Sequence, residues 1–293
     1  MVKLPSAGLR ARVALDSHGF RTTHSLGQNF LLDDGLLSDL LEQAGVKAEE
    51  NVLEIGPGPG VMTALLAERA KKVLAVELDE RLKPVLSDVL APYENVRVEF
   101  CDFMKADVQA LTGAWFGDEP YRVVANLPYY ITADILLKLT ACERKPESIS
   151  IMVQKEAAER IMSQPGQKQW CALAAILRYY GQAQVLEEVP PECFDPAPHV
   201  TSCFLKIDRY ADPPVKPSDE ALLMKVIQAA FAMRRKTLAN NLKSAFRIPQ
   251  DQAIGILNSA GVSEKVRGEA LSLAELNRVC EALSEVLKSG GAV

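Results

Sequence analysis

The sequence predicts an α/β fold in which a mostly parallel, seven-stranded sheet is followed by a smaller, all-α C-terminal region. Between Asn51 and Ile207, short β-branched runs alternate with longer amphipathic stretches, which is typical of strands connected by helices. Three prolines follow within residues 213–217 and interrupt regular structure, and the apolar spacing beyond them is helical. We therefore predict two domains, at residues 1–208 and 209–293, with an N-terminal arm at residues 1–30.

The strands are predicted from short runs rich in β-branched and aromatic residues, which turn residues separate. They cover residues 51–55, 72–77, 96–100, 121–126, 149–154, 183–189 and 202–207. Only a short loop without a helix separates the last two strands. We therefore expect these two to form an antiparallel pair at the end of the sheet.

The helices are predicted from apolar residues at three- and four-residue spacing. They cover residues 36–44 before the sheet, 60–70, 79–90, 132–140, 155–163 and 169–180 within it, and 219–232, 235–246, 250–258 and 272–287 after it. Ser272 and Glu275 have the spacing of a capping box at the start of the last helix.

Composition limits the class of protein. The 293 residues are 48% hydrophobic and 24% charged, which is ordinary for a globular chain and excludes a disordered or coiled-coil protein. No apolar run approaches the roughly 18 residues of a membrane span, and the N-terminus lacks the pattern of a secretory signal. The six cysteines contain no C-x-x-C pair, which argues against zinc and disulfides. We expect a cytoplasmic protein that binds neither metal nor membrane.

Charge is distributed unevenly along the chain. The net charge of −5 and the pI near 5.4 argue, as averages, against a polyanionic partner. Residues 225–247, however, contain six basic residues and no acidic one, and residues 1–24 contain four basic residues and one acidic one. An acidic chain can bind nucleic acid through such patches. We predict RNA contacts for Arg234, Arg235, Lys236 and Lys243, and expect at least one of the three consecutive residues to be structural. The alternative is a solvated helix face.

A glycine-rich turn follows the first predicted strand. Gly56, Gly58 and Gly60 allow the backbone to pass close to a ligand, and the helix after them offers free N–H groups, although tight strand-to-helix turns use the same pattern structurally. Glu77 ends the second strand about 20 residues later, where a carboxylate can accept hydrogen bonds from a ribose diol. The pattern describes a nucleoside-bearing cofactor, either a dinucleotide or S-adenosylmethionine.

Two further strand ends belong to the same edge of the sheet. Asp102 follows the third strand, where it can meet an adenine amino group; the alternative is a helix N-cap. The fourth strand ends in Asn126-Leu127-Pro128-Tyr129, and motifs of this type at this place are typical of methyltransferases that act on exocyclic amino nitrogens. This motif favours S-adenosylmethionine over a dinucleotide.

The combination of motifs resembles one family closely. It includes Gly27-Gln28-Asn29-Phe30-Leu31, Glu54-Ile55-Gly56-Pro57-Gly58, Asn126-Leu127-Pro128-Tyr129, Phe194-x-Pro196-x-Pro198-x-Val200-x-Ser202, and Arg234-Arg235-Lys236-Thr237-Leu238 with Leu242. In this order and spacing, from about His24 to Leu283, they resemble the ribosomal RNA small-subunit adenine dimethyltransferases, the KsgA family.

The resemblance implies a Rossmann-like class I methyltransferase fold and a monomeric enzyme. It implies S-adenosylmethionine-dependent N6,N6-dimethylation of two adjacent adenosines near the 3′ end of 16S rRNA, in the maturing 30S subunit. It places cofactor contacts on Gln28, Asn29, Leu31, Glu54, Gly56, Gly58, Glu77, Asp102 and Asn126. Glu54 has three candidate roles: orienting the glycine turn, binding the cofactor amine, or accepting backbone hydrogen bonds as a buried carboxylate. His199 stands where the family usually has Lys, which argues against a phosphate contact there.

The chemistry explains why the motif has these residues. The lone pair of adenine N6 is delocalised into the ring, so two acceptors on its hydrogens would aim that lone pair at the methyl donor. The Asn126 side-chain oxygen and the Leu127 carbonyl are the expected acceptors, because Pro128 fixes the turn that presents them. We expect Tyr129 and Phe194 to stack on the two faces of an extruded base. The alternative for both aromatic residues is core packing.

Three other functions remain as alternatives. The first is a macrolide-resistance methyltransferase of 23S rRNA, which shares the core motifs. The second is a non-enzymatic assembly factor with a vestigial pocket. The third, a dinucleotide oxidoreductase, is disfavoured because nothing in the motif after the fourth strand suits hydride transfer.

Overall fold

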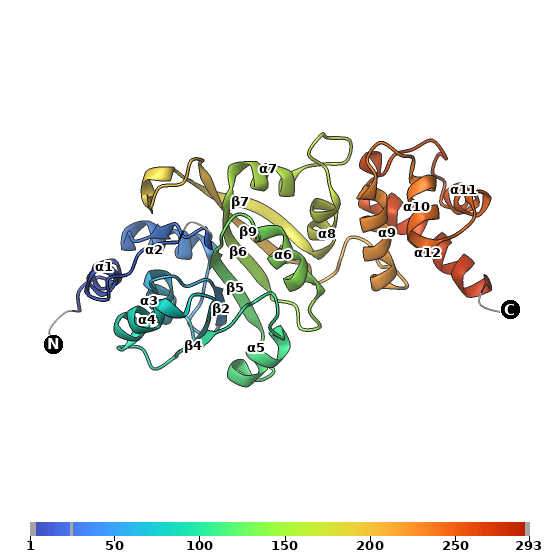
Figure 1. The fold of residues 1–293 in the computed structure, drawn as a ribbon. Coiled ribbons are helices and arrows are strands. Elements are labelled where there is room, and N and C mark those ends of the chain that lie inside the picture. Colours follow the sequence, from blue (N-terminus) through green and yellow to red (C-terminus); the bar gives the residue numbers. More distant parts are fainter. Residues whose placement is uncertain (1–3, 24–25, 291–293) are drawn as a thin grey trace. The chain divides into compact units, whose positions relative to one another are not determined.

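A computed structural model describes residues 4–23 and 26–290 (Figure 1). The positions 1–3, 24–25 and 291–293 lie outside the described residues, so the predicted N-terminal arm is described only in part. The chain divides into two compact units, one formed by Met1–Ala158 with Gln184–Arg209 and the other by Glu159–Ala183 with Tyr210–Val293. No helix in the described ranges is long and apolar enough to span a membrane.

The first unit is organised around the predicted seven-stranded sheet. Its strands, in spatial order, are β4 (Val96–Phe100), β3 (Lys72–Glu77), β2 (Asn51–Ile55), β5 (Tyr121–Asn126), β6 (Ser148–Gln154), β9 (Ser202–Arg209) and β7 (Gly181–Val189). The first five are parallel, and β9 runs antiparallel to β6. The chain moves outward from β2 in both directions, and such reversal points in α/β sheets form ligand crevices at the carboxyl ends of the strands.

Helices accompany this sheet in the first unit. Four of them, α1 (Ala7–Ser17), α2 (Asp34–Ala44), α3 (Val61–Ala67) and α4 (Lys83–Leu90), share one hydrophobic core with the sheet. The others are α5 (Val108–Phe116), α6 (Thr132–Ala141) and α7 (Lys155–Met162), which runs on into the second unit. The sequence did not predict α1 or α5. α1 buries only small side chains and a glycine, so it has little apolar periodicity, and it is tied to α2 because the Asp34 carboxylate accepts hydrogen bonds from the backbone N–H groups of Ala7 and Gly8.

The second unit is helical. It contains α8 (Ala172–Tyr180), α9 (Glu220–Ala232), α10 (Leu238–Phe246), α11 (Gln250–Ser259) and α12 (Leu273–Gly290). The predicted capping box forms, because Ser272 N and Glu275 N each donate to the other residue's side chain, at 2.8 and 3.3 Å. Residues 159–183, which the predicted division placed in the first domain, group here with the C-terminal helices. Within this segment Trp170 is fully buried, packs edge-on against Phe231 and donates its indole N–H to the Leu271 carbonyl.

Two glycines of the second unit provide a matched test of its packing. A Cβ at Gly268 would lie 2.0 Å from the Ala230 carbonyl oxygen, whereas a Cβ at Gly255, within α11, would meet nothing within 4 Å. We expect Gly268→Ala to destabilise this unit by roughly 3 kcal/mol or more, because backbone must move. Gly255→Ala is expected to stabilise it by about 0.5–1 kcal/mol through helix propensity. Urea unfolding of both variants measures these changes, and similar effects of the two would contradict the packing described.

Candidate active site

A single pocket gathers most of the predicted site residues at the carboxyl ends of β2 to β5. Its lining includes Gln28, Asn29, Leu31, Glu54, Gly56, Gly58, Glu77, Asp102, Asn126, Leu127, Pro128 and Tyr129. These residues come from four strand ends and from the segment that leads into β1 (Phe30–Leu31). Their individual roles stay predictions, but the fold places their side chains and backbone around one cavity.

The glycine turn serves both packing and access. Gly56, Gly58 and Gly60 have φ values of +70°, +55° and +86°, a region that other residues rarely adopt. A Cβ at Gly60 would lie 2.9 Å from a Leu86 methyl, and one at Gly58 would lie 3.0 Å from the Phe30 ring. At Gly56, which lines the pocket, the nearest atom would be 3.9 Å away. The positive φ therefore favours glycine at all three positions, close packing adds to this at 58 and 60, and Gly56 leaves room for a ligand.

The Glu77 side chain, at the end of β3, stabilises this glycine turn. One carboxylate oxygen accepts a hydrogen bond from Gly58 N at 3.1 Å and the other accepts one from Asp79 N at 2.8 Å. The side chain is almost fully buried, and burial raises the pKa of its carboxyl above the ordinary value. Each oxygen retains a further lone pair, so the group could also accept hydrogen bonds from a ribose diol.

Glu54 is the most unusual titratable group in the pocket. It is fully buried, and neither carboxylate oxygen has a hydrogen-bond partner among the described residues. Burial raises the pKa of Glu54 to about 8; the nearby Thr63 hydroxyl opposes this increase, and the charge of Glu77 adds to it. The backbone hydrogen bonds that one interpretation of the sequence expected are therefore not made. An unpartnered buried carboxylate facing a pocket fits a ligand that carries a positive charge.

Asp102 lies in the loop after β4. Its carboxylate accepts a hydrogen bond from Met104 N at 2.9 Å and pairs with Lys105 at 3.2 Å, and Lys105 is the main reason why the pKa of Asp102 is lowered. It therefore closes a turn and does not cap a helix; Asp107 caps α5. Lys138 of α6 holds the same loop by donating to the carbonyls of Met104 and Ala106.

The Asn126 side chain is oriented by the segment before β1. Its Nδ2 donates to the Asn29 carbonyl oxygen at 3.1 Å. Because the donor end of the amide is engaged, the Oδ1 end is left as an acceptor at the pocket. Leu127 is 2% exposed and buried in the same motif. The first unit thus presents an oriented acceptor beside a glycine turn and two carboxylates.

Comparison with known proteins identifies this arrangement. Residues 19–282 match the family model described as ribosomal RNA adenine dimethylase. The chain belongs to this family. It is 40% identical over 284 residues to the ribosomal RNA small subunit methyltransferase A of Geobacillus thermodenitrificans, covering 95% of this chain and 97% of that one. The protein of the same name from Lachnoclostridium phytofermentans is 39% identical over 277 residues, covering 94% and 96%.

Two solved structures support the fold of this adenine dimethylase. A dimethyladenosine transferase from Plasmodium falciparum superposes with a TM-score of 0.71 at 23% identity, covering 88% of this chain and 97% of that one. The 23S rRNA methyltransferase ErmE superposes with a TM-score of 0.64 at 25% identity, covering 87% and 100%. The predicted family, the class I methyltransferase fold and the assignment of the chain as an rRNA adenine dimethyltransferase are confirmed.

The two aromatic residues predicted to clamp the base occupy different environments in this dimethylase. Tyr129 lines the pocket, and its hydroxyl is hydrogen-bonded to Ser202 Oγ at 2.6 Å. Phe194 is 5% exposed, lies in the hydrophobic core, and forms β8 (Phe194–Asp195) against β1; it is not among the lining residues described. Tyr130, which no sequence motif singled out, also lines the pocket and is 63% exposed. Its exposure depends on the tertiary structure, and the sequence offered no signal for it.

The basic run of the second unit separates into two kinds of residue. The expected helix 235–246 begins only at Leu238, so Arg234, Arg235 and Lys236 lie in the turn before α10. Arg234 is structural, since it bonds Glu269 and the Lys168 carbonyl, at 3.1 and 2.8 Å. Arg235, Lys236 and Lys243 are exposed, and their side chains have no bonding partner in the part of the chain that the structure describes. His199 is exposed as well.

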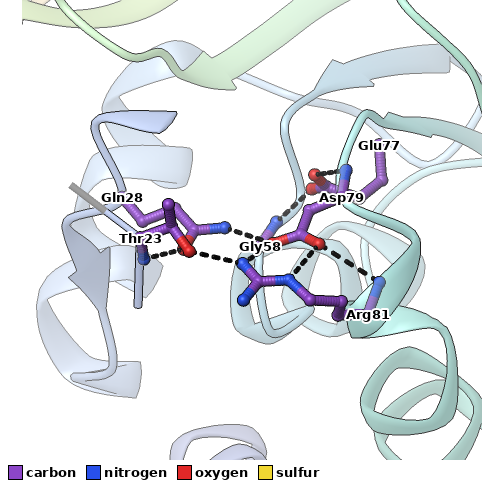
Figure 2. Close-up of polar contacts among 6 residues, drawn as sticks. All are labelled: Thr23, Gln28, Gly58, Glu77, Asp79 and Arg81. Atoms are coloured by element: carbon purple, nitrogen blue, oxygen red, sulfur yellow. Dashed lines mark hydrogen bonds and ion pairs between the residues drawn. The ribbon is translucent and has the colours of Figure 1, made fainter. Parts of the chain in front are cut away.

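A hydrogen-bonded network that was not predicted from the sequence lies beside the pocket. It joins Thr23, Gln28, Asp79 and Arg81 and adjoins the contacts of Glu77 (Figure 2). Asp79 lies two residues after Glu77, and that spacing at a strand end was the signal in the sequence that could have revealed the network.

Among the described residues, no group of three His, Cys, Asp or Glu side chains could hold a metal ion.

Proposed function

We propose that the protein transfers methyl groups from S-adenosylmethionine to N6 of two adjacent adenosines near the 3′ end of 16S rRNA in the maturing 30S subunit. The observation that carries this proposal is the orientation of Asn126, whose Nδ2 is engaged by Asn29 so that Oδ1 is left as an acceptor. Two relatives that cover nearly the whole chain bear the name of a small-subunit rRNA methyltransferase, which supports this substrate. The substrate places the proposed activity in the cytoplasm, where ribosomal subunits mature.

The pocket suits the proposed cofactor. When bound, S-adenosylmethionine supplies a methyl group on a sulfonium centre. Glu54, which is mostly protonated in the ligand-free protein at neutral pH, would ionise beside the ammonium group of its methionine part and pair with it, and Glu77 would accept hydrogen bonds from its ribose. Asp102 would accept a hydrogen bond from the adenine amino group, and Gly56 leaves space for the cofactor beside the turn. All these residues belong to the first unit of one chain, so the proposed cofactor site needs no residue from a second copy in the monomeric enzyme that we propose.

Asn126 and Leu127 would act on the substrate amino group. In the first transfer, the Asn126 Oδ1 and the Leu127 carbonyl would accept its two hydrogens and leave the nitrogen lone pair directed away from both acceptors. Each transfer releases one proton from the nitrogen to solvent, so in the second transfer one hydrogen remains for one of these acceptors. Tyr129 is held by Ser202 and borders this position, so its ring would support the base. Most of the rate enhancement would come from this positioning and from exclusion of water.

The proposal is tested by tritium transfer from labelled cofactor to immature small subunits and to naked rRNA, combined with primer extension across both rRNAs after deletion of the gene. We expect loss of the modification stops near the 3′ end of 16S rRNA. Loss of a stop in 23S rRNA alone would show a macrolide-resistance type of enzyme. Absence of transfer to any RNA, with intact binding to subunits, would show an assembly factor with a vestigial pocket.

Arg235 and Lys236 are the exposed bases proposed to contact the RNA backbone. We expect Arg235→Ala and Lys236→Ala each to raise KM for immature subunits and to reduce the slope of log affinity against log salt by about one, because each removes a phosphate contact. Affinity for S-adenosylhomocysteine should stay unchanged. Lys47→Ala, at an exposed base in the first unit, is the charge-matched control. Equal effects of all three substitutions would contradict a localised RNA surface.

A further inference from the structure

Asp79 is a buried carboxylate that the proposed mechanism does not use. Its side chain is 5% exposed and accepts hydrogen bonds from Gln28 Nε2 at 2.8 Å and from Arg81 Nε and Nη2 at 2.8 and 2.6 Å (Figure 2). Arg81 N donates to it as well, at 3.1 Å. Charge-assisted hydrogen bonds of this kind are among the stronger ones in proteins, and Asp79 itself is not among the residues described as lining the pocket.

The network fixes the Gln28 side chain at both ends. Gln28 Oε1 accepts a hydrogen bond from Thr23 N at 2.8 Å, while Nε2 donates to Asp79. Arg81 Nη2 also donates to Thr23 Oγ1 at 2.7 Å, so Thr23 and Gln28 are both tied to the loop after β3. Both ends of the Gln28 amide are hydrogen-bonded within the protein. The side chain therefore acts on the pocket by fixing the position of the Gln28 backbone.

That backbone continues directly into the residues that shape the site. Asn29, the next residue, accepts the hydrogen bond that orients Asn126. On the other side of the network, Asp79 N donates to Glu77, which in turn accepts from Gly58. Asp79 therefore connects the two sides: its carboxylate holds the segment that orients Asn126, and its backbone N–H holds Glu77, which supports the glycine turn.

We propose that Asp79 is a positioning residue that holds residues 28–31 against the pocket and thereby sets the affinity for the cofactor without touching it. The proposal rests on the function proposed above, because it names what the pocket binds. Gln28 is, on this view, the partner through which Asp79 acts.

An exchange of the two side chains tests the proposal in the full-length protein. Asp79→Asn removes the negative charge and replaces one acceptor oxygen with a donor, which then faces donors of Arg81 and, at the Oδ2 position, the donor of Gln28 as well. Gln28→Glu places a carboxylate against Asp79. We expect each to weaken binding of S-adenosylhomocysteine about tenfold, the loss typical of a hydrogen bond to a charged group. In the double variant, the amide introduced at position 79 can donate to the carboxylate introduced at position 28. We therefore expect it to bind more tightly than either single variant.

Hydrogen exchange in the ligand-free protein provides a readout that does not depend on the cofactor. Amides of residues 28–31 are expected to exchange faster in both single variants and to slow again in the double variant. Asp88→Asn is the matched control, because the carboxylate of Asp88 pairs with His18 in an exposed position and should affect neither measurement.

Two outcomes would overturn the proposal. One is wild-type affinity and exchange in Asp79→Asn. The other is a double variant that binds no better than Gln28→Glu, which would mean that Gln28 contacts the cofactor directly. A wild-type protein that fails to bind S-adenosylhomocysteine would refute the proposed function instead, and the exchange measurements would still decide whether Asp79 holds the segment.

Discussion

Replacement of Asn126 by alanine is expected to lower the rate of methyl transfer to immature subunits by about a hundredfold or more at saturating cofactor. The reason is that the variant removes an acceptor oriented toward the amino group on which the reaction occurs, and loss of one oriented hydrogen-bonding group in an active site has effects of this size. Single-turnover transfer of tritium measures the rate, and calorimetry with S-adenosylhomocysteine measures cofactor affinity, which we expect to change much less.

Asn258→Ala is the matched control for this substitution. Asn258 is exposed on α11, and its side chain makes no hydrogen bond within the described residues. Full dimethylation by Asn126→Ala would refute the mechanism. If Asn126→Ala abolishes methylation while small-subunit assembly proceeds normally, binding of the subunit and catalysis are separable roles of the protein.

Replacement of Glu54 by glutamine is expected to stabilise the ligand-free protein at alkaline pH. The folded protein holds the pKa of Glu54 at about 8, above the ordinary value of 4.5, so between these pH values the folded state binds a proton that the unfolded state has lost. The contribution of Glu54 to stability is therefore greatest below pH 4.5 and decreases by up to about 1.4 kcal/mol per pH unit as the pH rises toward 8. Glutamine does not titrate, so the variant does not lose folding stability in this way as the pH rises.

Urea unfolding of wild type and Glu54→Gln at pH 5.5 and 8.5 measures the effect. We expect the difference between their free energies of unfolding to grow by a few kcal/mol in favour of the variant at the higher pH. Glu49→Gln, at an exposed carboxylate just before β2, is the control. An equal difference at both pH values would show that Glu54 is not a buried acid of raised pKa.

The same variant distinguishes the remaining roles of Glu54. If the carboxylate attracts the ammonium group of the cofactor, Glu54→Gln should weaken binding of S-adenosylhomocysteine at pH 8.5 while it stabilises the ligand-free protein. If Glu54 only orients the glycine turn, affinity should stay unchanged.

Much of the fold could be predicted from local sequence patterns. The seven strands of the sheet and the capping box of α12 follow from residue spacing, because strand and helix periods and cap geometry depend on neighbours in sequence. The helix α1 could not be found in this way, because its buried face consists of alanines and a glycine. The helix expected at 235 begins instead at Leu238.

The candidate site, like the fold, was predictable from the sequence only in part. The sequence alone determined which motifs end β2 to β5, and their order along a parallel sheet was enough to expect them around one pocket. Only the tertiary structure decided which partner each side chain meets: Asp79 for Gln28, Asn29 for Asn126, and Glu269 for Arg234. It also left Glu54 without a partner. These outcomes depend on residues far apart in the chain that folding brings within hydrogen-bond distance, and no local pattern encodes such distances.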